Sequence, residues 1–147
     1  MPTLVSRGSS SAVWPAYAAG SWASLFILHH MYWAFGGTIG LAGRSMTGTL
    51  LLVNLLAIPL LLVATGAAFA TIQSWGKMLP PQALSVTVWG VSVVSSVRGI
   101  GGLVQRFLLS GHSDGHTLLS TIADPWFVLG GILFGLTASA FTWQPSN

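Results

Sequence analysis

Four long apolar stretches dominate the chain, and short segments rich in glycine, proline or polar residues separate them. The stretches cover residues 13–35, 47–72, 83–109 and 125–143. An α-helix needs about 20 residues to cross a hydrocarbon core of about 30 Å, and each stretch reaches or approaches that length. Together they predict a single all-α domain, residues 1–147, folded as an integral membrane four-helix bundle. Four crossings would place both termini on the same side of the membrane.

Glycine and proline mark the boundaries of these stretches. Gly36 and Gly37 would end the first, because a glycine pair loosens a helix and favours a turn. Pro59 lies inside the second, where neighbouring helices can satisfy the carbonyl that proline leaves free. Asp124 and Pro125 form a favourable N-cap and first-turn pair, which predicts that the fourth helix begins there.

The composition independently places the chain in a membrane. Only 5% of the 147 residues are charged and 52% are hydrophobic, whereas a soluble domain carries roughly 25% charged residues. We therefore expect a multi-pass protein of the cell membrane, surrounded by lipids. Five basic and two acidic residues give a formal charge of +3, which provides too few basic groups for a nucleic-acid-binding surface. The chain has no cysteine, which excludes disulfides and thiolate-bound metals.

Arg98 is the most informative polar residue, because it lies well inside the third apolar stretch. A charge at membrane depth costs about 2.5–3.5 kcal/mol on insertion scales, so such residues usually face inward and are paired or functional. One interpretation is an arginine whose long side chain reaches lipid head groups. The other is a buried cation that pairs with Asp124 or binds an anionic or carbonyl group of a ligand.

The predicted topology brings the scarce ionisable groups to one side of the membrane, opposite the termini. His29 and His30 lie near the end of the first stretch, and Arg98 lies in the second half of the third. With a rise of about 1.5 Å per residue, His29 sits roughly 10 Å before Gly36, and Arg98 roughly 16 Å before the end of its stretch. Because these depths overlap, we expect one polar cavity in one leaflet that holds Arg98, Asp124 and at least one of the two histidines.

The candidate site divides into catalytic and ligand-binding residues. His30 and Asp124 are candidates for general acid/base chemistry, with Arg98 as the cation beside them. Indole rings suit a flat lipophilic ligand or a carbocation, although ordinary packing is the simpler explanation for each of them. The predicted ligand-binding residues are His29, Trp33, Trp89, Trp126, Asn54 and Ser95.

A metal site has weak support in the sequence. His112, Asp114 and His116 flank Gly115 in the polar segment between the third and fourth stretches. A loose divalent-metal site and an ordinary solvated loop are both compatible with that pattern, and we favour the loop. Haem bound through His29 or His30 has no second histidine on another apolar stretch to support it. We therefore expect no metal and no cofactor.

The residues His30–Gly37 fit the pattern H-x-x-W-A-x-G-G, and Arg98 is followed by Gly99 in the third stretch. With Asp124 before a glycine-rich fourth stretch, this set resembles an uncharacterised bacterial family of small four-span membrane proteins. The resemblance covers nearly the whole chain. It implies four spans and a shared polar constellation, and it carries no established activity.

Three functions remain open from the sequence. The first is a protein that binds an isoprenoid- or quinone-like molecule, and that converts it by proton transfer if it is an enzyme, in an isomerisation or cyclisation. The second is an accessory or structural subunit, with Gly131, Gly135 and Ser139 forming a small-residue face for contact with a partner or with a second copy. The third is a small proton-coupled transporter, which the lack of a mid-span carboxylate makes the weakest of the three.

Overall fold

The computed structural model describes residues 13–109 and 118–142, and the regular secondary structure within these ranges is helical. The elements are α1 (Trp14–Ala34), α2 (Gly48–Ala70), the short 3₁₀ helix η2 (Ser74–Met78), α3 (Pro81–Leu109) and α4 (Leu118–Thr142). The all-helical fold class expected from the apolar stretches is therefore confirmed for the described residues.

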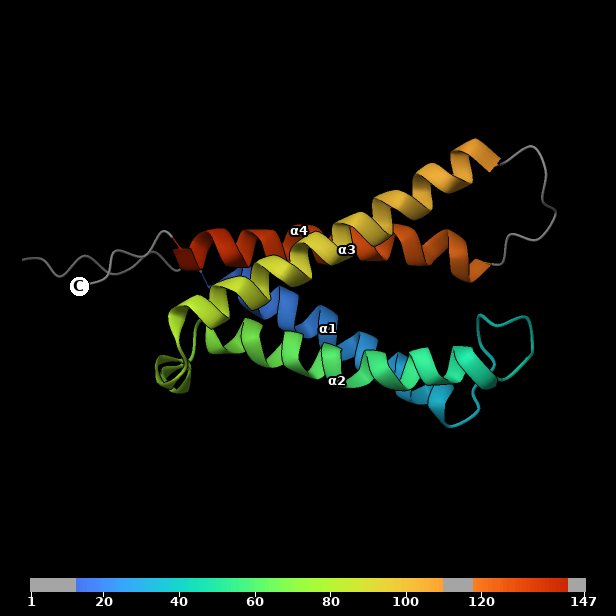
Figure 1. The fold of residues 1–147 in the computed structure, drawn as a ribbon, viewed down its shortest axis with the longest axis horizontal. Helices are drawn as coiled ribbons and strands as arrows, with labels where there is room; N and C mark the ends of the chain where they lie inside the picture. Colours follow the sequence, from blue (N-terminus) through green and yellow to red (C-terminus); the bar gives the residue numbers. More distant parts are fainter. Residues whose placement is uncertain (1–12, 110–117, 143–147) are drawn as a thin grey trace, which may run out of the picture.

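The helices form two antiparallel pairs, α1 with α2 and α3 with α4, which pack on each other mainly through α1 and α4 (Figure 1). The start of α1 and the end of α4 lie at the same end of the bundle, on the left of Figure 1. At this closed end, which also carries η2, the two pairs lie together. At the opposite end, which carries the end of α1, residues 35–47 and the start of α4, the pairs diverge (Figure 1). We call this the open end.

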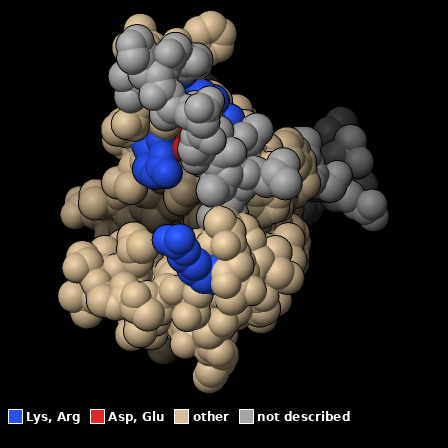
Figure 2. Space-filling model, turned by 90° about the vertical axis from the view of Figure 1, so that its right-hand side faces the viewer, with Lys and Arg blue, Asp and Glu red and all other residues tan. Residues whose placement is uncertain are grey.

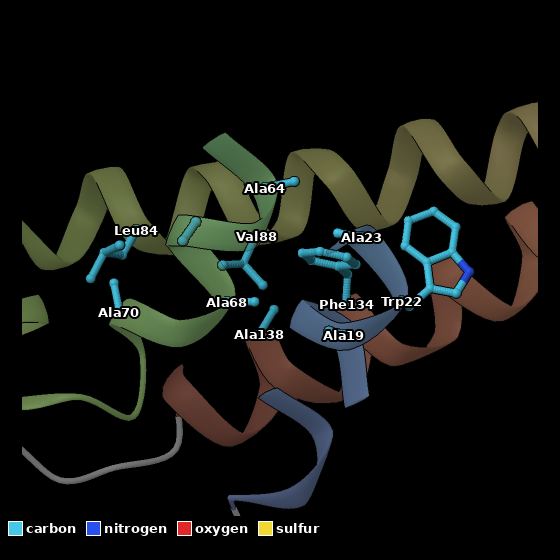
Figure 3. Close-up of a cluster of buried hydrophobic side chains, with 11 residues drawn as sticks. Ala19, Trp22, Ala23, Ala64, Ala68, Ala70, Leu84, Val88, Phe134 and Ala138 are labelled. Atoms are coloured by element: carbon cyan, nitrogen blue, oxygen red, sulfur yellow. The ribbon is translucent and has the colours of Figure 1, made fainter. Parts of the chain in front are cut away.

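Small side chains explain the closed end. The buried core consists largely of alanines around Val88 and Phe134, both of them 0% exposed (Figure 3). The alanines that share this core are Ala19, Ala23, Ala64, Ala67, Ala68, Ala70 and Ala138. Residues this small let helix backbones approach closely, which is how helices associate in lipid, where apolar burial alone gives no driving force. The core runs from Leu84 at the closed end to Trp22, which packs against α4 (Figure 3).

The seam between α3 and α4 uses serine and glycine. The Ser92 hydroxyl donates to the carbonyl of Gly131 at 2.7 Å. A Cβ added at Gly99 would lie 2.6 Å from the backbone nitrogen of Val128, so α3 needs a glycine there. A Cβ added at Gly131 would overlap the Ser96 hydroxyl. The small-residue face of α4, expected to serve contacts between copies, therefore packs against α3 of the same chain.

Helix α4 begins earlier than its sequence suggests. The pair Asp124–Pro125 was expected to open the helix, but α4 starts at Leu118 and Pro125 lies inside it. The prediction that Asp124 is an N-cap is therefore wrong. Proline inside an apolar helix leaves one carbonyl without its usual partner, a loss that such helices tolerate. As a result, Asp124 sits one turn and a half into the helix, and its side chain points to α3 instead of capping.

Within the described ranges, three helical segments are long and apolar enough to cross a membrane: Gly48–Ala70, Pro81–Leu108 and Ile122–Thr142. They correspond to three of the four predicted spans. The remaining prediction, residues 13–35, corresponds to α1, which has 21 residues. Its paired histidines, tyrosines and tryptophans lower its hydropathy below that of the other three.

Candidate ligand-binding site

The divergence of the helix pairs leaves a cavity of about 940 Å³ at the open end. Its walls come from α1, from residues 38–46, and from α3 and α4. Aromatic and aliphatic groups make up most of the lining, and Arg98, His29 and His30 are the ionisable side chains among the described lining residues. A volume near the upper end of the roughly 300–1,000 Å³ typical of small-molecule sites is ample for a lipophilic ligand.

Arg98 extends from α3 into the lining of this cavity, and Asp124 of α4 holds one edge of its guanidinium group. Its Nη1 donates to Asp124 Oδ1 at 2.9 Å, and its side chain is 53% exposed, whereas that of Asp124 is 7% exposed. The guanidinium carbon lies 5.3 Å from the centre of the Phe127 ring, close enough for a cation–π contact. Arg98 is therefore part of the cavity wall, and Asp124 lies behind it.

A second arginine shares the same carboxylate. Arg106 donates from Nη2 to Asp124 Oδ2 at 3.0 Å, so each oxygen of Asp124 accepts from a different guanidinium. The two arginines are eight residues apart on α3, which places them roughly 12 Å apart along the helix with Asp124 between them. Gly102 makes this possible, because a Cβ there would overlap the Asp124 carboxylate. One carboxylate therefore holds both guanidinium groups.

The view onto the open end shows the resulting charge distribution. Basic side chains lie on both sides of a hollow, and only a small patch of acidic surface is visible beside them (Figure 2). Arg44, which is exposed in the segment between α1 and α2, follows directly after the lining residue Gly43. Among the described residues, the open end thus carries more positive than negative groups.

His30 enters the cavity with a defined hydrogen-bond pattern. Its Nδ1 lies 2.9 Å from the carbonyl oxygen of Phe26, one helical turn earlier. A carbonyl only accepts, so Nδ1 carries the proton of this bond, and in the neutral ring Nε2 is left as an acceptor. The Asn54 side-chain amide donates to the backbone carbonyl of His30 at 2.9 Å and so fixes this turn of α1 against α2.

Aromatic rings surround the two histidines. The centre of the His30 ring lies 4.5 Å from that of Phe26, and the His29 ring lies 4.0 Å from that of Trp33, both edge-on. The sequence predicts at least one of the two histidines in the cavity, and the structure places both in its lining. Across the cavity, Phe26 also contacts Phe127 of α4, with 5.1 Å between ring centres.

The segment after α1 is folded back as a third wall. Gly36 has a φ of 89°, a left-handed conformation that ends the helix and turns the chain. The Trp33 indole then donates to the carbonyl of Ile39 at 3.0 Å, and the Tyr32 hydroxyl accepts from the backbone nitrogen of Thr38 at 3.1 Å. The aromatic residues at the end of α1 thereby hold residues 38–46 against the cavity.

A comparison with protein-family models identifies one matching family. A family model described as "Protein of unknown function (DUF3995)" matches residues 23–134, which includes every cavity wall. The chain belongs to this family. No curated protein and no solved structure matches the chain. The expected membership in a family of unknown function is confirmed, and DUF3995 supplies no activity for the cavity.

In this DUF3995 chain, the predicted site residues separate into three groups. Five line the cavity: His29, His30, Trp33, Arg98 and Trp126. Asp124 and Asn54 lie immediately behind the lining and hold Arg98 and the His30 backbone.

Trp89 and Ser95, the other two predicted ligand-binding residues, lie outside the lining. Ser95 is buried, with 5% of its surface exposed, and Trp89 is 42% exposed. Trp89 precedes Arg98 by nine residues, which rotates it by about 180° around the helix and moves it roughly 14 Å toward the closed end. Its helical phase therefore excludes it from the cavity, and neither residue contacts the proposed ligand space.

Some residues that line the cavity were not among the site residues predicted from the sequence. The segment Thr38–Met46 supplies a whole wall, and Phe26 and Phe127 supply the rings nearest to His30 and Arg98. Glycines at positions 36, 37, 40 and 43 were the available signal for a folded segment. The described residues hold no group of three or more metal-ligating side chains. His112, Asp114 and His116 lie outside the described residues.

Proposed function

We propose that this chain is a four-span protein of the cell membrane that binds a lipophilic molecule in the open-end cavity. The observation that carries the proposal is the half-exposed guanidinium of Arg98 in a cavity whose walls are otherwise mainly aromatic and aliphatic. The polar end of the ligand would meet Arg98 and His30. Its apolar part would lie along Trp33, Trp126 and Phe127.

The four-span arrangement is supported by the way α1 packs. α1 lies against both α2 and α4 and contributes Ala19, Trp22 and Ala23 to the common core. Its 21 residues correspond to a length of about 31 Å, which matches the hydrocarbon core of a bilayer. A helix so placed between two apolar neighbours would cross the membrane with them.

Conversion of the ligand by proton transfer is the enzymatic form of this proposal, with an isoprenoid- or quinone-like substrate. His30 is the better acid/base group, because its Nε2 is an available acceptor in the cavity lining. Asp124 is poorly placed for that role, since both of its oxygens accept from arginines and its side chain is 93% shielded. In this scheme Asp124 positions Arg98.

The structure gives less support to the two alternative functions, an accessory subunit and a proton-coupled transporter. The small-residue face of an accessory subunit is occupied within the chain, since Gly131 and Gly135 pack on α3. Proton-coupled transport would require a carboxylate that can load and release protons in the pathway. Asp124, the one acidic group among the described residues, is held by two guanidinium groups instead.

The test is to fill the cavity and follow the bound molecule. Ala123 lines the cavity, whereas Ala83 is an exposed alanine on α3 that lies outside it. Native mass spectrometry of protein extracted in mild detergent should reveal a co-purifying lipophilic molecule. Ala123→Trp should abolish that mass, and the matched control Ala83→Trp should retain it. Wild-type protein without any bound lipophile, or equal occupancy in the two variants, would refute the proposal.

A further inference from the structure

We propose that the polar end of the ligand is an anion, a phosphate or carboxylate on a single apolar chain, and that Arg98 recognises its charge. This inference rests on the ligand-binding function proposed above and adds the chemical class of the ligand. Its basis is the position of a half-exposed guanidinium in an otherwise mainly apolar cavity.

Arg98 shares its acidic partner, Asp124, with Arg106. Asp124 carries one negative charge and gives one oxygen to Arg98 and the other to Arg106. Asp124 is also the sole acid among the described residues, and it stands behind the cavity wall. Arg98 is therefore held by one oxygen of a carboxylate that also binds Arg106, while about half of its side chain stays exposed. Guanidinium N–H groups beside apolar surface are costly when they lack an acceptor, and an anion entering the cavity would reduce that cost.

The geometry of the guanidinium also favours an anion. Arginine has five N–H donors in a planar fork, and Nη1 of Arg98 is engaged with Asp124. The side chain is 53% exposed, so the part that does not face Asp124 is open to the cavity. Such a fork fits the oxygens of a phosphate or carboxylate in pairs and is pre-organised here by Asp124 and by the ring of Phe127. A single neutral carbonyl oxygen would accept hydrogen bonds from fewer of these N–H groups.

A second cation next to the wall formed by residues 38–46 favours the same ligand class. Arg44 is exposed and lies in sequence between the lining residues Gly43 and Met46. The hollow in Figure 2 has basic side chains on both sides. Positive charges near a cavity raise the local concentration of anions and repel cations. The site is thus unsuited to a cationic head group.

The rest of the lining indicates what the anion is attached to. Trp33, Trp126, Phe127 and Ile122 offer no charge to a free inorganic ion. They offer apolar surface of the type that covers an alkyl or isoprenoid chain. We therefore assign the ligand as a single-chain anionic amphiphile and treat a free anion, or the head group of a two-chain membrane phospholipid, as competing sources of the same chemistry.

The experiment compares head groups on one chain length. The full-length protein in nanodiscs of zwitterionic lipid is titrated with hexadecyl phosphate, palmitate and hexadecanol, and separately with inorganic phosphate and an anionic two-chain phospholipid. Binding is read from tryptophan fluorescence, because two indoles line the cavity. Hexadecyl phosphate and palmitate should bind at least tenfold more tightly than hexadecanol, and added salt should reduce the difference.

Substitutions of Arg98 test whether this residue causes the preference for anionic head groups. Arg98→Gln should abolish the tenfold difference while hexadecanol still binds, and Arg98→Lys should retain part of it. Lys77→Gln is the matched control, because Lys77 is an exposed cation in η2 at the closed end, and it should leave all affinities unchanged.

Each contrary outcome has its own meaning. Equal affinity for the anionic amphiphiles and hexadecanol would overturn the anion assignment and leave the ligand-binding function intact. Failure of all three single-chain probes to bind would overturn both. Tight binding of inorganic phosphate alone would replace the amphiphile with a free anion, and selective binding of the two-chain phospholipid would replace it with a bulk lipid. Either result would refute the proposed class.

Discussion

The two ends of the bundle are built from the same four helices and differ in what lies between them. At the closed end the interhelical positions are alanines, and the helix pairs meet around Val88 and Phe134. At the open end the corresponding positions carry Phe26, His30, Trp126 and Phe127, whose rings keep the pairs apart. In a membrane, where close packing and hydrogen bonds must hold helices together, small residues give the stability. The difference indicates that the closed end determines the fold and the open end is available for a ligand.

The largest effect on stability is expected from a substitution at the centre of the closed-end core. Phe134→Ala deletes a ring that is 0% exposed, and it should lower the free energy of unfolding by up to about 3–5 kcal/mol. The control is Phe107→Ala, at a ring that is 89% exposed near the end of α3, which should change stability little. Reversible unfolding followed by circular dichroism in detergent measures both. Similar losses for the two variants would mean that the closed end is not the stable core.

The next test overfills the same core. Ala68 is 0% exposed, so Ala68→Leu should push the helix pairs apart and cost about 1–3 kcal/mol of unfolding free energy. Ala83→Leu adds the same side chain at an exposed position of α3 and should be nearly neutral. The measurement is the midpoint of thermal unfolding, compared between the two variants. A neutral Ala68→Leu would show that the closed end has room to expand.

At the open end the strongest stability effect should come from the shared carboxylate. Asp124→Asn replaces an acceptor of two charge-assisted hydrogen bonds and should cost about 1–2 kcal/mol, less than for a fully buried pair because Arg98 is half exposed. The same change in an Arg98→Gln background should cost less, since one of the two bonds is already absent. A double-mutant cycle by thermal unfolding gives the coupling. Additive effects would show that the ion pair contributes nothing.

The smallest effects should come from two glycines that differ only in backbone conformation. A Cβ added at Gly36 or at Gly101 meets nothing within 4 Å. Gly36 has a φ of 89°, so Gly36→Ala should cost about 1 kcal/mol through backbone strain. Gly101 lies inside α3, where Gly101→Ala should add about 0.5–1 kcal/mol of stability. Unfolding midpoints that shift in the same direction would contradict this account of the α1 corner.

The sequence predicts the site only as far as the order of the helices places its residues at the same end of the bundle. Counting the helices placed His30, Arg98 and Asp124 together, and the structure pairs Arg98 with Asp124. Trp89 was predicted to bind a ligand but lies outside the cavity lining, because membership in an apolar stretch does not specify which face of the helix meets a cavity. Asp124 was assigned as a cap from the proline that follows it, since local capping preference cannot anticipate that the helix continues on the other side.

The sequence by itself determined an all-helical chain of membrane composition, the approximate limits of its helices and the end at which its few charges gather. Those properties follow from hydrophobic content and helical periodicity, which are local. Only the tertiary structure decided that the helix pairs diverge, that one carboxylate serves two arginines, and that residues 38–46 close one wall of a cavity. These depend on how tightly each pair of helices packs along its length, and that is settled by the side chains of both partners together.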